Sequence, residues 1–391
     1  MPLSCAKSTS PSARTGSVGS GERAMGHRMA KSFGAPHLIT IGLVVSGLGT
    51  ASCGSADPDA DPNRSEDPTE VRPGGSNGSN DGPGASGDDG QDGTEVGGAP
   101  ESPTQPPAAP TCPKYEEPLP TQASLAGLSF SREKAADFLL GALALRYPVG
   151  KAIVEGGMSS EGVYGNCLDV FLTNKSSADG VLRHAATTVH ECGHFYDLRL
   201  SKGTTSTLVI RPDLTFACES GDTTSRGGKT FARSLLTRDA HAAKRRPCGG
   251  GGKGCDSYGT TYLTGGSGEQ GYNFVLEEAA QYVNSLATAL AFREPYAGSR
   301  ASERDGILTF LWYIERYLAI ARNEYPEAYQ LISENECWRK ATLTIWDRAW
   351  LYLDATKDMK ELGLDDEAIV PLVNEPELLA EIEALRKLEC K

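Results

Sequence analysis

The sequence predicts an α+β domain that is dominated by helices, with a few strands before and after the one helix that carries two closely spaced histidines. Three observations support this fold class. Apolar residues recur at helical spacing in several long segments, and β-branched and aromatic residues cluster in three short ones. The first 111 of the 391 residues differ in composition from the rest. About 280 residues remain for folding, which is enough for one large domain or two closely packed lobes.

Residues 1–53 are typical of an export leader. Their apolar run at 38–48 is too short for a membrane span of about 20 residues and suits the core of a signal peptide. The small residues before Cys53 resemble the sequence at which bacterial lipoproteins are cleaved and acylated, although Thr50 departs from the usual leucine. We therefore expect an exported protein that is anchored to a bacterial membrane by a lipid on Cys53. The alternative is ordinary cleavage near Ser55, which gives a secreted protein.

Residues 54–111 are rich in glycine, proline, serine and aspartate and contain almost no large apolar residue. Such a segment cannot bury enough surface to offset the entropy of ordering it, so we expect a disordered tether that reaches roughly 40 Å on average. It contains 12 acidic residues and two arginines, and so accounts for 10 of the 13 net negative charges of the chain. Because the remainder is nearly neutral, we expect no nucleic-acid partner.

Residues 112–391 alternate long helical segments with short strand candidates. The first helix opens at Ser131, a residue type that caps helix N-termini. By apolar periodicity we expect helices at 131–147, 180–200, 273–292, 302–323, 338–356 and 375–388. We expect strands at 168–172, 206–210 and 214–217, and a glycine-rich loop at 248–271.

Eight cysteines follow the leader, and an even number in an exported chain favours disulfides over free thiols. Cys248 and Cys255 flank a glycine-rich hexapeptide, and we expect them to close a local loop. Cys192 lies between the two histidines in sequence. On a helix it falls on the opposite face, so we expect a core or disulfide residue there.

The two histidines, His190 and His194, are four residues apart on the helix expected at 180–200. At about 100° per residue their side chains lie about 40° apart on one face, which lets both imidazoles reach one tetrahedral zinc ion. Glu191 follows directly and suits a general base for a water that the metal activates. Asp197 returns to the same face, where its carboxylate can accept an imidazole N–H and fix the ring.

A catalytic zinc needs a third protein ligand and an open position. Leu200 stands where the metzincin pattern places its third histidine, and this excludes that class. A glutamate from a later helix is the other common solution. Glu277 and Glu278, on an otherwise apolar and alanine-rich helix, are the candidates.

The segment 190–197, with the sequence HECGHFYD, resembles the active-site helix of gluzincin metallopeptidases, especially the anthrax lethal-factor type. In that family the two histidines are followed by aspartate at this spacing, and the ligand glutamate is followed three residues later by alanine. Glu277 with Ala280 matches this pattern better than Glu278 does. The resemblance implies a zincin-like fold and a zinc ion held by His190, His194 and Glu277.

The resemblance also implies a mechanism. Glu191 takes a proton from the water and later delivers it to the leaving amine. A tyrosine supports the oxyanion, and Tyr258 is the first candidate, with Tyr272 as a rival and His241 as a third choice. The implied function is a zinc metallopeptidase that acts on a peptide or protein, with its catalytic domain at 112–391. The alternative is a surface-anchored binding module that keeps a structural zinc site without turnover.

Overall fold

The computed structural model describes residues 115–159, 165–219, 229–248, 253–297 and 300–390. The predictions for the leader, for Cys53 and for the tether fall outside these residues. Within the described ranges, none of the helices combines the length and the apolar character needed to cross a membrane.

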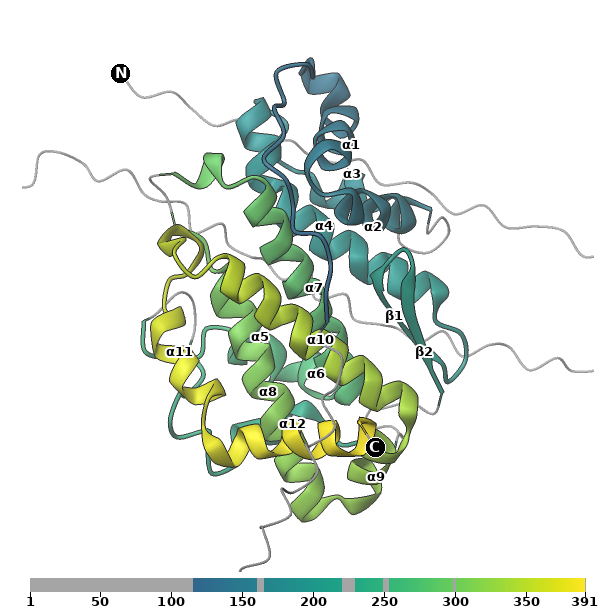
Figure 1. The fold of residues 1–391 in the computed structure, drawn as a ribbon, viewed down its shortest axis with the longest axis vertical. Coiled ribbons are helices and arrows are strands. Elements are labelled where there is room, and N and C mark those ends of the chain that lie inside the picture. The colour runs from purple at the N-terminus through teal and green to yellow at the C-terminus, as the bar shows by residue number, and fades with distance from the viewer. Residues whose placement is uncertain (1–114, 160–164, 220–228, 249–252, 298–299, 391) are drawn as a thin grey trace, which may run out of the picture. The chain divides into compact units, whose positions relative to one another are not determined.

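The fold is helix-dominated α+β, as the sequence predicts (Figure 1). The helices are α1 Ala135–Arg146, α2 Pro148–Met158, α3 Cys167–Phe171, α4 Ala178–Leu200, α5 Gly259–Tyr262, α6 Gly265–Gly268, α7 Tyr272–Ala291, α8 Glu303–Glu324, α9 Pro326–Glu334, α10 Glu336–Ala355, α11 Asp366–Val373 and α12 Pro376–Glu389. The strands are β1 Ser206–Arg211 and β2 Leu214–Cys218.

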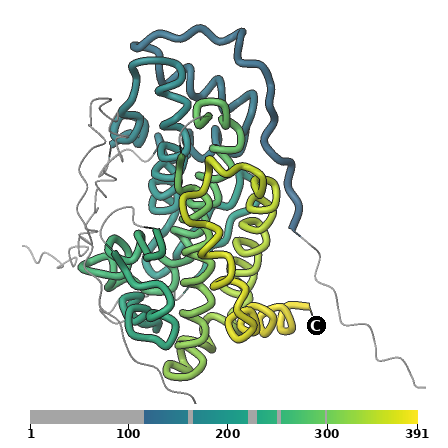
Figure 2. The backbone as a smooth tube through the Cα atoms, turned by 90° about the vertical axis from the view of Figure 1, so that its left-hand side faces the viewer, coloured from purple at the N-terminus to yellow at the C-terminus, as the bar shows by residue number. Residues whose placement is uncertain are grey.

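Helix α7 lies at the centre of the packing and contacts α4 on one side and α8 and α10 on others (Figure 1). Helix α2 covers α4, while α11 and α12 cover α8. The segment before α1 runs along the outside of these helices (Figure 2). It is held there by Gln122, which donates to the carbonyl of Leu290 in α7, and by a buried ion pair between Glu117 and Arg348 of α10. The histidine-bearing helix is therefore enclosed between α2 and α7.

Both strands follow α4 and form one antiparallel hairpin. The strands expected at 206–210 and 214–217 are confirmed, with the turn at Pro212. The strand expected at 168–172 is wrong, because this segment forms α3. The side chain of Asn166 accepts a hydrogen bond from the amide of Leu168 and caps a helical turn there.

Three helices were not expected from the sequence. Helices α2 and α9 begin at Pro148 and Pro326, where a proline suits the first helical position because its missing N–H has no partner to lose. Helix α11 contains Pro371, which weakens the periodic signal. The glycine-rich region expected as a loop at 248–271 also contains two helical turns, α5 and α6.

Disulfides join several of these elements. The expected pair Cys248–Cys255 is confirmed. Cys192 is also a disulfide residue, as expected, and it joins α4 to Cys167 of α3. A further bond joins Cys218 of β2 to Cys337 of α10. The helix that carries the histidines is thus held covalently on the side opposite to them.

Candidate metal centre

The two histidines lie where α4 comes very close to α7. A Cβ atom added to Gly193 would lie 1.8 Å from the side-chain oxygen of Gln281, so only glycine permits this approach. His190 is 6% exposed, and its imidazole faces α7 together with that of His194. The close approach brings the side chains of α7 into reach of both rings.

Three donor atoms converge on one point at this contact. The Nε2 atoms of His190 and His194 are 3.0 Å apart, and Oε2 of Glu278 is 3.6 Å from each of them. A triangle with these sides has a centre about 2.0 Å from all three corners, which matches the usual zinc–nitrogen and zinc–oxygen distances. The three atoms therefore fit one zinc ion without rearrangement.

The same oxygen of Glu278 is buried and has no hydrogen-bond partner in the described part of the chain. A buried carboxylate oxygen without a partner costs free energy unless a cation lies against it. Because the unpartnered oxygen faces two imidazole nitrogens, the donor set suits a cation that accepts nitrogen and oxygen ligands, as zinc does.

The outer ring nitrogens are held by other groups of α7. Nδ1 of His194 lies 2.8 Å from Oε1 of Glu277, and Nδ1 of His190 lies 3.2 Å from the hydroxyl of Ser285. Hydrogen bonds at Nδ1 fix the orientation of each ring and leave Nε2 free to bind a metal.

This arrangement corrects the expected third ligand. Glu278, and not Glu277, points between the two Nε2 atoms, while Glu277 orients His194 from behind. The alanine three residues after Glu277 carried no information about how α7 is rotated about its axis. That rotation decides which of two adjacent side chains lies between the two Nε2 atoms.

Asp197 also has a different role from the expected one. Its carboxylate accepts hydrogen bonds from the amide of Val209 at 2.8 Å and from Nε2 of Gln281 at 2.9 Å, not from an imidazole. Burial, reinforced by the charge of Glu277, raises the pKa of Asp197 well above its usual value. Asp197 thus ties α4 to β1 and α7, and it positions the Gln281 side chain that packs on Gly193.

Electrostatics at the centre favour a cation. Burial opposes a positive charge on His194, but the carboxylates of Glu277 and Glu278 outweigh it and raise the pKa of this imidazole well above its usual value. Burial likewise opposes a negative charge on Glu278, but the charge of His194 and contact with both imidazoles hold its pKa below the usual range. The Glu278 carboxylate therefore stays ionised, as a metal ligand must be.

Two tyrosines lie near the centre. Burial, reinforced by the charges of Glu278 and Glu191, raises the pKa of Tyr262 well above its usual value. Its hydroxyl is 2.9 Å from the hydroxyl of Tyr282. The ring of Tyr282 packs edge-on against His190, with 4.7 Å between ring centroids. Glu191, next to His190 on α4, is half-buried.

The residues expected to support the oxyanion are engaged elsewhere. Tyr258 donates its hydroxyl hydrogen to the carbonyl of Ser302, and Tyr272 is hydrogen-bonded to the hydroxyl of Thr342. The imidazole of His241 lies against Glu375, at the start of α12. The structure does not bring these three groups to the donor atoms, and it brings Tyr262 and Tyr282 instead. Tyr282 is four residues after Glu278, a helical spacing that could have identified it from sequence.

A second group with ligand-type atoms, formed by His241, Glu375 and Glu377, has a different character. Nζ of Lys244 lies 2.6 Å from the Glu375 carboxylate and 3.6 Å from that of Glu377. A lysine ammonium therefore already supplies the positive charge that these carboxylates require.

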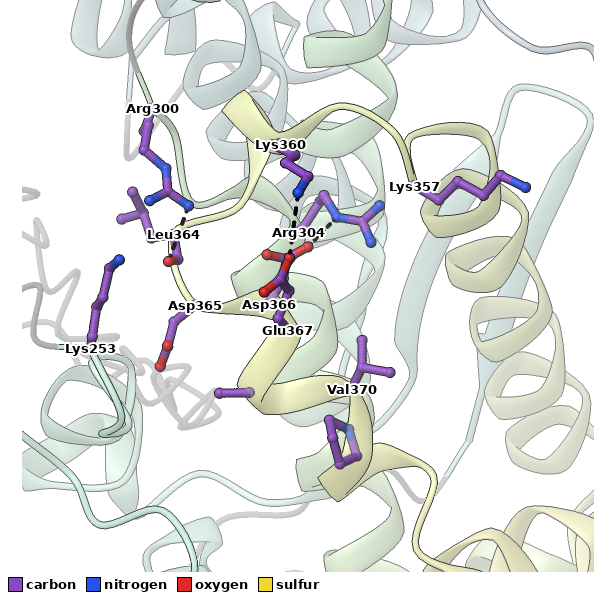
Figure 3. Close-up of a pocket in the computed structure, with 12 residues that line it drawn as sticks. Lys253, Arg300, Arg304, Lys357, Lys360, Leu364, Asp365, Asp366, Glu367 and Val370 are labelled. Atoms are coloured by element: carbon purple, nitrogen blue, oxygen red, sulfur yellow. Dashed lines mark hydrogen bonds and ion pairs between the residues drawn. The ribbon is translucent and has the colours of Figure 1, made fainter.

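A hollow of about 650 Å³ lies beside the start of α11 (Figure 3). Its walls include Lys253, Arg300 and Arg304, and none of its lining residues belongs to the candidate metal centre. Arg304 is bound to the Asp366 carboxylate at 2.7 Å, and Arg300 donates to the carbonyl of Gly363. These arginines stabilise the turn that leads into α11.

No family model, curated protein or solved structure matches the chain.

Proposed function

We propose that the chain is a zinc-dependent hydrolase, and specifically a metallopeptidase of the gluzincin type with a zincin-like fold. The observation that carries this proposal is the convergence of Nε2 of His190, Nε2 of His194 and Oε2 of Glu278, of which the last is buried without a hydrogen-bond partner among the described residues. Three protein donors leave a fourth position of a tetrahedral zinc ion open, whereas structural zinc sites use four protein donors. The donor set therefore favours catalysis over a purely structural role.

Zinc bound at this centre supplies Lewis-acid chemistry, which makes a water molecule acidic near neutral pH. Residues of the chain transfer the protons and stabilise the oxyanion. Glu191 accepts the proton of the water and passes it to the leaving amine. The hydroxyl of Tyr262, which lies 2.9 Å from that of Tyr282 beside His190, donates a hydrogen bond to the oxyanion that forms at the peptide carbonyl. Tyr282 orients that hydroxyl.

The substitution Glu191→Gln tests the proposal. Zinc content of the purified protein, measured by mass spectrometry, should be about one ion per chain in both the wild type and the variant, because Glu191 is not a ligand. Hydrolysis of a mixed peptide library by the variant should be about 10²- to 10⁴-fold slower, because the variant lacks the general base.

His190→Ala and His194→Ala serve as controls that should lose the metal. If both keep a full complement of zinc, the metal assignment is wrong. A wild type that binds zinc but cleaves no peptide identifies a binding module with a structural zinc site. A Glu191→Gln variant that is as fast as the wild type contradicts the assignment of the base.

A further inference from the structure

The first turn of α8 packs against Tyr282, the tyrosine whose ring lies edge-on to His190. A Cβ atom added to Gly306 would lie 2.3 Å from the ring of Tyr282, so α8 approaches this ring as closely as a helix can. Phe310 stacks on the same ring, with 5.2 Å between centroids. Glu303 precedes these two residues by three and seven positions, which places it on the same face of α8. Glu303 therefore belongs to the face of α8 that packs on Tyr282, the tyrosine beside His190.

The carboxylate of Glu303 affects the pKa of neighbouring side chains, and they affect its own. Burial raises the pKa of Glu303 to about 7, although the nearby His190 charge acts in the opposite direction. Its own charge contributes to the raised pKa values of Tyr258 and Tyr296, after burial, which is the main cause for both. The hydroxyl of Tyr258 donates to the carbonyl of Ser302, the residue next to Glu303. Glu303 thus follows the carbonyl that binds Tyr258 and lies one turn before Gly306, which packs on Tyr282.

Several carboxylates of the chain lie against a cation, and within the described ranges Glu303 does not. Glu294 is paired with Arg146, Glu381 with Arg322 and Glu375 with Lys244. Among the described residues, no hydrogen bond or ion pair joins Glu303 to a basic side chain, although Glu303 is only half-exposed. A half-buried, unpaired carboxylate has lost part of its hydration without gaining a partner, so it favours a cationic ligand.

We propose that Glu303 binds a positively charged group of the substrate, an ammonium or guanidinium, next to the bond that is cleaved. The proposal rests on the proposed function and names the substrate class of the same site. The carboxylate supplies a charge-assisted hydrogen bond, and the neighbouring tyrosine rings suit the flanks of a cation. Two sources share this chemistry: a free amino terminus, and the side chain of lysine or arginine within a longer peptide.

Binding to the zinc-loaded Glu191→Gln variant of the full chain tests the proposal independently of turnover. One set of fluorescent peptides differs only in a lysine, leucine or glutamate at a single central position, with both ends blocked. A second set has leucine at that position and either a free or an acetylated amino terminus. We expect one cationic peptide to bind about 10- to 100-fold more tightly than its neutral counterpart, as a charge-assisted contact would give. The set in which this occurs identifies the source of the cation.

Two further substitutions in this background assign the preference to Glu303. Glu303→Gln should abolish the preference for the cationic peptide, and Glu303→Lys should transfer it to the glutamate peptide. Glu324→Gln removes a carboxylate from the exposed end of the same helix and should leave the preference intact. Equal affinity for all peptides, no measurable binding, or a preference that survives Glu303→Gln overturns the inference. Peptide hydrolysis by the wild type separately decides the proposed function.

Discussion

Two adjacent glutamates on α7 are assigned different roles, and removing the charge of each in turn tests this assignment. Glu278→Gln removes the anionic donor whose oxygen lies 3.6 Å from both Nε2 atoms. Glu277→Gln leaves all three donor atoms in place and replaces a charge-assisted hydrogen bond of 2.8 Å to Nδ1 of His194 with a neutral one. We therefore expect both variants to bind zinc more weakly, and Glu278→Gln to be affected far more.

The sizes of the two effects follow from the contacts. A hydrogen bond to a charged group contributes about 1.5–3 kcal/mol, and a neutral one about 0.5–1.5 kcal/mol. The difference of about 1–2 kcal/mol predicts that Glu277→Gln weakens zinc binding about 10-fold, within the range usual for groups that orient metal ligands. Loss of a ligand is more severe, and Glu278→Gln should weaken binding by more than about 100-fold.

Competition with a chromogenic zinc chelator at fixed pH measures both affinities on one scale. Glu324→Gln, which makes the same change of charge at an exposed site on α8, serves as the matched control. If Glu277→Gln loses more affinity than Glu278→Gln, the third ligand is Glu277 and our interpretation of the rotation of α7 is wrong.

Two further predictions concern the oxyanion and the core. Tyr262→Phe should lower peptide turnover by about 10²- to 10³-fold at unchanged zinc content, because it removes an oxyanion donor; Tyr258→Phe should not, and equal losses in both variants would refute the assignment. Glu315 is fully buried, both its oxygens lack a partner among the described residues, and burial, reinforced by Glu375 and Glu381, raises its pKa to about 10. The folded state keeps a proton that the unfolded state loses above about pH 4.5, so this group lowers the free energy of unfolding as pH rises from there toward 10. Glu315→Gln should therefore stabilise the protein by about 4 kcal/mol more at pH 8 than at pH 5 in urea unfolding, and an equal effect at both pH values would contradict the prediction.

Sequence patterns that act within one element predicted the structure well. The four-residue spacing of His190 and His194 placed both rings on one face of α4, and helical geometry alone placed Cys192 on the other face. The hairpin after α4 was readable from its β-branched residues and from the turn at Pro212. The loop closed by Cys248 and Cys255 followed from a separation of seven residues.

Features that depend on contacts between elements were not predictable in the same way. The choice between Glu277 and Glu278 depends on the rotation of α7, which the contact of Gln281 with Gly193 and Asp197 fixes. No local pattern in the sequence encodes that contact. The correct tyrosine was missed for a related reason. The glycine-rich region folds into α5 and α6, and its path determines that Tyr262 lies near the metal centre while Tyr258 turns toward Ser302.

The metal donors and the groups that orient them all come from two helices in direct contact, α4 and α7. Among the residues that the structure describes in the stretch at 201–271 between these two helices, none supplies one of the three donor atoms. Tyr262 belongs to that stretch. The connection between the two helices therefore supplies the proposed oxyanion donor but none of the donor atoms found among the described residues. A protein engineer could vary the residues around Tyr262 to alter reactivity and leave the α4–α7 pair and its contact with β1 unchanged.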